Sequence, residues 1–169
     1  MKKILFVRHG KAESASWEID DLDREITTQG SYDTTLVSNE VLCRLVPDVS
    51  KTMMVVSDAK RALQSSEIYL KNWALSEKQC KVWPNLYGDL TTVDFIDYVS
   101  HNVSDEIDLL VIVGHNPTLS DLVNQMGEDL DCWMSTAGVV TLELDLDSWS
   151  KIEARTAKMQ FSLFPSEIR

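Results

Sequence analysis

Four side chains of this chain have the chemistry to bind and transfer a phosphoryl group: Arg8, His9, Arg61 and His115. Phosphoryl transfer needs positive charge and hydrogen-bond donors around three equatorial oxygens, with nucleophile and leaving group in line. An arginine offers a planar fork that matches phosphate oxygens, and a neutral imidazole nitrogen can attack phosphorus. We therefore predict that His9 is the nucleophile and that Arg8 and Arg61 clamp the phosphoryl group. His115, when protonated, would add a hydrogen bond to the developing charge.

The elements that must position these side chains are short apolar runs, which cover residues 4–7, 53–56 and 109–113. Apolar runs of this length fit strands that are buried on both faces. If the three strands are parallel neighbours, their carboxyl ends meet at one edge of the sheet, where open α/β sheets place their chemistry. Arg61 is further predicted in the first turn of a helix, beside free backbone N–H groups that also favour anions.

The rest of the chain indicates an α/β fold. Helices are predicted from Thr27 or Thr28 to about residue 45, from about residue 59 to 73, over 93–99, and from Pro117, with Asn116 as N-cap, to about residue 126. Residues 80–90 predict a short strand and loop. Residues 139–146 alternate as a half-exposed strand does, and residues 152–159 are expected to pair with them as a hairpin. We therefore expect a mainly parallel central sheet flanked by helices, with an antiparallel edge, in a single domain over residues 1–169.

Composition narrows the classes of partner. The 27 acidic residues exceed the 16 basic ones and give a net charge of −11, which argues against nucleic-acid and anionic-membrane partners. The three cysteines are widely spaced and form no CxxC pair, as expected for free thiols in the cytoplasm. The sequence contains no P-loop or other obvious magnesium site, so we expect neither a metal nor another cofactor.

Several other residues attract attention but have a simpler interpretation. The acidic run of Asp20, Asp21 and Asp23 is typical of a solvated loop rather than a metal site. His101 lies in a polar stretch and is expected at the surface. The five tryptophans are expected to pack in the core or at its rim, except Trp17, which follows the first motif closely enough to contact a substrate.

Four blocks of the chain resemble the histidine phosphatase superfamily, which has the phosphoglycerate mutase-like fold, and most of all its small SixA-type phosphohistidine phosphatases. The blocks are RHGKA at 8–12, DREITTQG at 23–30, SDAKRALQS at 57–65 and VGHNP at 113–117. The resemblance implies that His9 accepts the phosphoryl group and that no metal is needed. It also implies that Arg8, Arg61, His115 and Asn116 form the phosphate pocket. The implied substrate is phosphohistidine on a partner signalling protein.

Two departures from that pattern keep alternatives open. Asp58 stands where the family has proline, so its carboxylate must point away from the pocket or weaken phosphate binding. Relatives that act on alkyl phosphates use a carboxylic acid to protonate the leaving group, and Asp89 is the one comparable candidate here, although a solvated or helix-capping role is the simpler reading. The alternatives are therefore a phosphatase of small phosphomonoesters and a non-catalytic phosphate-binding module. A mutase is disfavoured, because the chain is too short to build a closed pocket.

Overall fold

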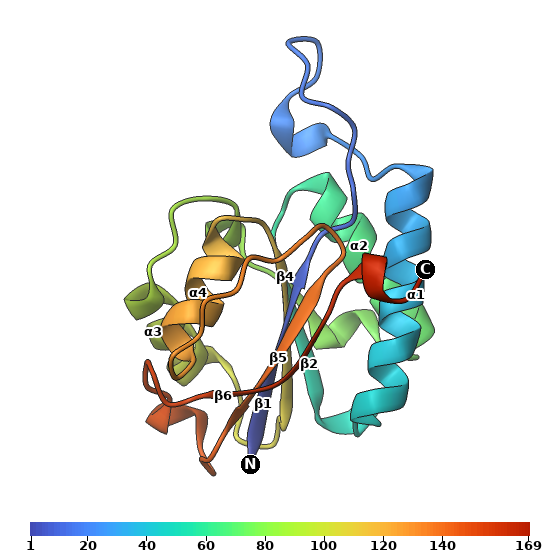
Figure 1. The fold of residues 1–169 in the computed structure, drawn as a ribbon. Coiled ribbons are helices and arrows are strands. Elements are labelled where there is room, and N and C mark those ends of the chain that lie inside the picture. The colour runs from blue at the N-terminus through green and yellow to red at the C-terminus, as the bar shows by residue number, and fades with distance from the viewer.

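The computed structural model describes all residues, 1–169, and contains one six-stranded sheet with helices on both faces (Figure 1). The strands are β1 (Lys2–Arg8), β2 (Thr52–Val56), β3 (Cys80–Val82), β4 (Leu109–Gly114), β5 (Val139–Leu144) and β6 (Lys158–Leu163). Their order is β3-β2-β4-β1-β5-β6. The first four strands run parallel, and β5 pairs antiparallel with both of its neighbours, β1 and β6. The predicted mainly parallel sheet with an antiparallel edge is confirmed.

Two pairs of helices cover the sheet and enclose two apolar cores. The helices are α1 (Thr28–Leu45), α2 (Lys60–Asn72), α3 (Thr92–Asn102) and α4 (Thr118–Met126). The pair α1 and α2 lies on one face and the pair α3 and α4 on the other (Figure 1). Alternate side chains of β1 serve the two cores: Leu5 and Val7 pack on the first face, and Ile4 and Phe6 on the second. None of the four helices has both the length and the apolar content that crossing a membrane requires.

Burial of the strands explains why the first polar side chains appear at their ends. Every residue of β2 and β4 is buried, and so are residues 4–7 of β1. Hydrophobic burial therefore fixes the register of these strands, since a slip of one residue would exchange the two cores. The carboxyl ends of β1, β2 and β4 lie at the same edge of the sheet, at the end where the segment 11–27 projects (Figure 1).

The start of α4 is one residue later than predicted. Pro117 occupies the N-cap position and the helix begins at Thr118. Asn116 still accepts a hydrogen bond from the backbone N–H of Ser120 at 3.3 Å, but its amide also donates to the carbonyl oxygen of Met134 at 2.8 Å. The second contact holds Asn116 in the loop before the helix, so the helix starts beyond it.

The two antiparallel strands also differ from the prediction. β5 is buried on both faces rather than half-exposed, because it lies between β1 and β6 with a core on each side. β6 begins at Lys158 rather than at Ile152. Trp149 and Ile152 are buried in the core beside α3, and the Trp149 indole donates to the carbonyl oxygen of Ile107 at 2.9 Å. The expected antiparallel pairing of the two strands is present, but burial of these apolar side chains makes the connection between them, residues 145–157, longer than predicted.

Candidate active site

The sheet brings the four predicted residues together. Arg8 ends β1 and His9 follows it, while His115 follows the neighbouring parallel strand β4. The two imidazole rings lie 5.0 Å apart between centroids. Arg61 enters from the first turn of α2, after the strand on the other side of β4, and its Nε lies 3.3 Å from His9 Nε2. The predicted convergence at one edge of the sheet is thus present in the structure.

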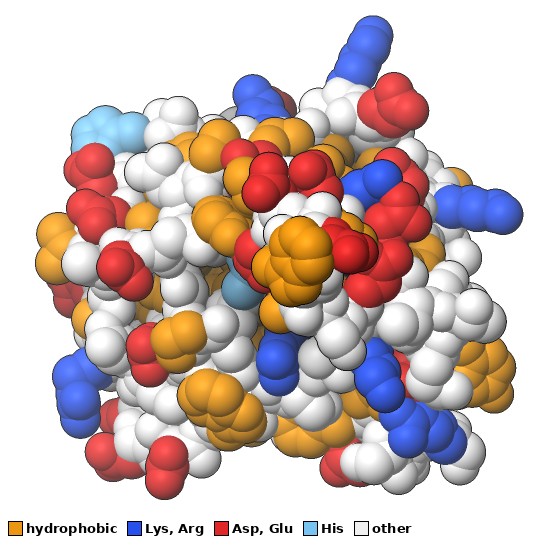
Figure 2. Space-filling view, turned by 90° about the horizontal axis from the view of Figure 1, so that it is seen from above, with side chains coloured by type: hydrophobic (Ala, Val, Ile, Leu, Met, Phe, Trp, Pro, Cys, Tyr) orange, Lys and Arg blue, Asp and Glu red, His pale blue; other side chains and the backbone are white.

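These residues line a small, positively charged cleft with a volume of about 280 Å³. Its walls are formed by Arg8, His9, Lys11, Ala12, Arg24, Arg61, His115, Asn116 and Thr136. Four of these residues are cationic and none is acidic, although the whole chain carries a charge of −11. Seen from above, the surface shows a recessed histidine near its middle, with acidic and hydrophobic side chains gathered around it (Figure 2). The cleft is therefore a local anion site in an acidic surround.

His9 is held in the state that a nucleophile needs. Its Nδ1 lies 2.7 Å from the carbonyl oxygen of Gly10, which can only accept, so Nδ1 carries the proton and Nε2 keeps its lone pair. Burial, together with the charges of the nearby Arg61 and Arg8, lowers the pKa of His9 to about 4. His9 is therefore neutral at pH 7, with Nε2 available for attack on phosphorus.

His115 is also neutral at pH 7, because burial, with a smaller effect of a protonated His9 and of Arg61, lowers its pKa to about 3. Its Nε2 lies 2.8 Å from the hydroxyl of Ser57, the residue that follows β2, and its Nδ1 is buried without a partner. A phosphoryl dianion in the cleft would favour the protonated ring, which could then donate a hydrogen bond to it. The expectation that His115 acts in its protonated form thus depends on bound anion.

Arg8 is anchored at one nitrogen and unpartnered at another. Its Nη1 donates to the carbonyl oxygen of Met134 at 2.9 Å, which directs the guanidinium into the cleft wall. Its Nε is buried and has no hydrogen-bond partner in the protein. Because Arg8 lines the cleft, its guanidinium is placed to donate hydrogen bonds to phosphate oxygens there.

Close packing requires a glycine at position 10, within the RHGKA block. A Cβ on Gly10 would lie 2.6 Å from the Thr34 hydroxyl oxygen and 2.7 Å from the carbonyl oxygen of Gly30. Gly10 also donates its N–H to the Ser65 hydroxyl at 2.9 Å, which ties it to α2. The N-terminus of α1 and the start of α2 therefore clamp the peptide that orients His9.

Asp21 contacts residues of the site, which its sequence context did not predict. Its carboxylate accepts hydrogen bonds from Arg61 Nη2 at 3.0 Å, from the Tyr87 hydroxyl at 2.6 Å and from Arg24 Nη1 at 2.7 Å. Asp21 is exposed, as expected for the acidic run, but it also bonds residues of the site. No sequence signal separates it from its two acidic neighbours, because Arg61 and Tyr87 lie on distant segments.

The remaining candidates occupy different places. Asp89 is exposed and its side chain makes no hydrogen bond, although Tyr87, two residues before it, packs edge-on against the His115 ring with centroids 5.6 Å apart. Asp58 is half-buried and lies outside the cleft lining. Asn116 lines the cleft, but its side-chain amide is engaged with Met134 and Ser120, which makes it a support for the wall.

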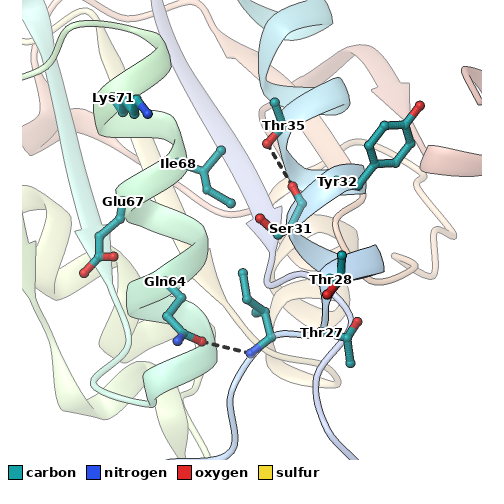
Figure 3. Close-up of a pocket in the computed structure, with 10 residues that line it drawn as sticks. Thr27, Thr28, Ser31, Tyr32, Thr35, Gln64, Glu67, Ile68 and Lys71 are labelled. Carbon is teal, nitrogen blue, oxygen red and sulfur yellow. Dashed lines mark hydrogen bonds between the residues drawn. The ribbon is translucent and has the colours of Figure 1, made fainter.

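The largest cavity of the molecule lies elsewhere, in an open groove of about 770 Å³ between α1 and α2 (Figure 3). It is lined by Ile26, Thr27, Thr28, Ser31, Tyr32, Thr35, Gln64, Glu67, Ile68 and Lys71. No imidazole or arginine faces this groove, and its polar groups partly bond one another, as the Thr35 hydroxyl does to the Ser31 carbonyl oxygen. Size alone therefore does not identify the site, whereas the converging charges do. No group of three or more His, Cys, Asp or Glu side chains is placed to hold a metal ion.

Comparison with known proteins identifies the fold. No protein-family model and no curated protein matches this chain. Solved structures do match: SixA complexed with tungstate superposes with a TM-score of 0.80 at 19% identity over 99% of each chain. A putative SixA from Nakamurella multipartitia gives 0.79 at 21% identity, over 97% of this chain and 96% of that one. A mycobacterial glucosyl-3-phosphoglycerate phosphatase gives 0.65 at 17%, over 95% and 97%. The predicted phosphoglycerate mutase-like fold is thereby confirmed.

Proposed function

We propose that this protein is a metal-independent phosphatase that removes the phosphoryl group from phosphohistidine on a partner protein. The reaction proceeds through a phosphorylated intermediate on His9. Arg8 and Arg61 bind the phosphoryl oxygens, and His115 stabilises the transferring group. In line with the charge of −11 and the free thiols, we place the protein in the cytoplasm, as one domain that acts on a signalling protein.

The main support for this proposal is the protonation and tautomeric state of the His9 ring. A neutral imidazole with its proton fixed on Nδ1 presents Nε2 to the cleft, within 3.3 Å of a guanidinium nitrogen. In the structure this lone pair accepts a hydrogen bond from Arg61 Nε, a donor that phosphoryl oxygens can take over when they bind. A site that only binds phosphate needs the positive charges but has no use for a neutral imidazole among them. The arrangement therefore favours turnover over binding alone.

The chemistry balances without an added acid. His9 Nε2 attacks phosphorus, and the P–N bond of the substrate breaks with its electron pair returning to the substrate imidazole. A substrate ring that is protonated on its other nitrogen leaves as neutral imidazole. The His9 ring, still protonated on Nδ1, becomes a cation bearing the phosphoryl group, and its contact with the Gly10 carbonyl oxygen becomes charge-assisted.

Hydrolysis of the intermediate completes the cycle. Water attacks phosphorus, the P–Nε2 bond breaks with its electron pair returning to Nε2, and both water protons leave with the phosphate as H₂PO₄⁻. Arg8 and Arg61 stay charged throughout and neutralise the equatorial oxygens in both steps. The same pocket can therefore serve both half-reactions.

A second candidate is a phosphatase of small phosphomonoesters. It is favoured by the likeness to a mycobacterial structure named glucosyl-3-phosphoglycerate phosphatase. An alkoxide leaves poorly unless an acid protonates it, and the one acid considered for that role, Asp89, is exposed and outside the cleft lining. The phosphohistidine reading needs no such acid, and we prefer it for that reason.

The test is hydrolysis of a protein phosphorylated on histidine with phosphoramidate, beside a panel of small phosphomonoesters, with His9→Ala as the control. Preference for the phosphohistidine protein that is abolished in His9→Ala is the expected result. Faster turnover of a monoester, lost in Asp89→Asn, would support the second candidate. Absence of turnover with phosphate still bound would leave only a binding module.

A further inference from the structure

Asp21 closes one side of the cleft through Arg61. The Arg61 guanidinium has its Nε at 3.3 Å from His9 Nε2, while its two terminal nitrogens donate to the backbone oxygen and the carboxylate of Asp21. One guanidinium group therefore separates the nucleophile from a carboxylate. A phosphoryl group seated on His9 Nε2 has this carboxylate as a near neighbour on the Arg61 side.

The position of the Asp21 carboxylate is fixed by contacts with α2, with the loop after β3 and with Arg24 of its own segment. Tyr87 reaches it from the loop after β3 at 2.6 Å, and Arg24 from the far end of the short helix Asp21–Asp23 at 2.7 Å. Arg24 in turn donates its Nε to the Glu13 carbonyl oxygen at 2.8 Å and thereby braces the projecting segment. The Asp21 side chain is 45% exposed and bonds two residues that line the cleft, Arg61 and Arg24, so it lies at the rim of the cleft rather than in its wall.

Asp21 remains ionised at neutral pH and cannot supply a proton. The hydrogen bonds from Tyr87 and Arg24 hold the pKa of its carboxyl group far below the usual range, and Arg61 lowers it further. Three hydrogen bonds occupy acceptor sites of this carboxylate, two on Oδ2 and one on Oδ1, so Oδ1 can accept one more from the N–H of a cationic leaving ring, whereas an ester leaving group offers no such donor. The negative charge of the carboxylate also repels substrates that carry a further anionic group at the entrance.

On the basis of the proposed function, we propose that Asp21 is a specificity-determining residue that selects phosphoramidates with a cationic leaving ring, such as phosphohistidine, over phosphomonoesters. The carboxylate accepts a hydrogen bond from the N–H of the substrate imidazolium and so holds its proton on the nitrogen that is not phosphorylated. When the P–N bond breaks, the electron pair goes to the phosphorylated nitrogen, and the ring departs as neutral imidazole with that proton. No proton passes to or from Asp21.

The test compares two small substrates on one preparation of the full chain: phosphoimidazole, whose ring can be protonated, and phenyl phosphate, whose ring cannot. In Asp21→Asn, the ratio of kcat/KM for phosphoimidazole to that for phenyl phosphate should fall about 1.5- to fivefold, the range for one partly exposed charge pair. Asp21→Glu keeps the charge and should retain most of the ratio. The ratio does not depend on the folded fraction, so a partly unfolded variant still gives an answer.

Glu18→Gln is the matched control, because it removes one charge from the same projecting segment at an exposed residue whose carboxylate forms no salt bridge, whereas that of Asp21 binds Arg61. Its ratio should equal that of the wild type. If Asp21 merely positioned or masked Arg61, both substrates would change together and the ratio would not move, which would overturn the inference. Hydrolysis of neither substrate by the wild type would instead refute the proposed phosphatase itself.

Discussion

The floor and the entrance of the cleft are built in different ways. The floor consists of Arg8, His9 and His115 at the ends of two central strands, together with Arg61 from the first turn of α2. His9, Arg61 and His115 are all less than 9% exposed. The entrance is the projecting segment 11–27, whose Asp21 and Trp17 are 45% and 94% exposed. The hydrogen bonds of the sheet and two apolar cores position the floor, whereas isolated backbone bridges within the segment and side-chain contacts position the entrance.

This difference indicates a division of labour. Transfer of a phosphoryl group requires donors held rigidly in a dry setting, which buried strand ends provide. Discrimination between leaving groups requires charge placed where the rest of the substrate lies, which an exposed segment provides. Changes in the floor should therefore reduce turnover of every substrate, and changes at the entrance should alter preference among substrates.

The largest effect is expected for Arg61→Ala. Loss of its guanidinium removes donors and charge from the transition state and should lower kcat at least about a hundredfold for phosphoimidazole and phenyl phosphate alike. Steady-state kinetics with both substrates measures this. Arg24→Ala is the matched change at the entrance and should cost less than about tenfold. Equal losses in the two variants would contradict the distinction between floor and entrance.

Ser57→Ala should have an intermediate effect. The Ser57 hydroxyl is the hydrogen-bond partner that the structure gives His115 Nε2, at 2.8 Å. Without it the ring is free to turn, and kcat should fall about tenfold with little change in KM. Ser66→Ala removes another buried hydroxyl of the same region, bonded to the Leu63 carbonyl oxygen, and should leave kcat unchanged. A loss in Ser66→Ala as large as in Ser57→Ala would mean that general packing, not His115, is responsible.

At the entrance, Trp17→Ser should weaken recognition of a protein substrate only. The Trp17 side chain is almost fully exposed and contributes no buried apolar surface, so its removal should not affect folding. Exposed aromatic side chains beside a site commonly anchor a partner, so KM for a histidine-phosphorylated protein should rise about two- to fivefold. KM for phosphoimidazole should not change. Val46→Ser, at the far end of α1, is the control for loss of an exposed apolar side chain. A Trp17→Ser variant with unaltered kinetics on the protein would remove Trp17 from the interface.

The smallest change is expected when pH is lowered. With a pKa of about 4, His9 stays mostly neutral at pH 5, so kcat/KM should fall less than about twofold between pH 7 and 5 once the ionisation of the substrate is corrected. A histidine with an ordinary pKa would lose roughly thirtyfold over that range. Stability should behave differently. Because the pKa of His9 is lower in the folded protein than in the unfolded chain, the unfolded chain binds more protons below pH 6.5. The free energy of unfolding should therefore decrease as pH falls from about 6.5 towards 4.

The sequence predicts the floor well because its determinants are local. Three apolar runs mark buried strands, and the residues that follow them, among them His9 and His115, must then emerge at one edge of a parallel sheet. The α1 helix, capped by Thr27, is likewise specified by neighbouring residues. Burial and capping act over a few positions, so periodicity and residue type suffice.

The entrance could not be predicted in the same way. The contact between Asp21 and Tyr87 joins residues 66 positions apart, and it depends on how two loops lie over the sheet. The late start of β6 has a similar cause, since burial of Trp149 beside α3 outweighs the alternating pattern of the preceding strand. Asp89 has the right chemistry for an acid, but the fold leaves it at the surface.

The central claim is that His9 carries the phosphoryl group during turnover. The most direct test is to mix the protein with radiolabelled phosphoimidazole, quench in alkali within milliseconds, and locate the label by mass spectrometry. We predict an acid-labile, alkali-stable phosphoryl group on His9, and neither label nor turnover in His9→Ala. A label on another residue, or undiminished turnover in His9→Ala, would contradict the proposed mechanism.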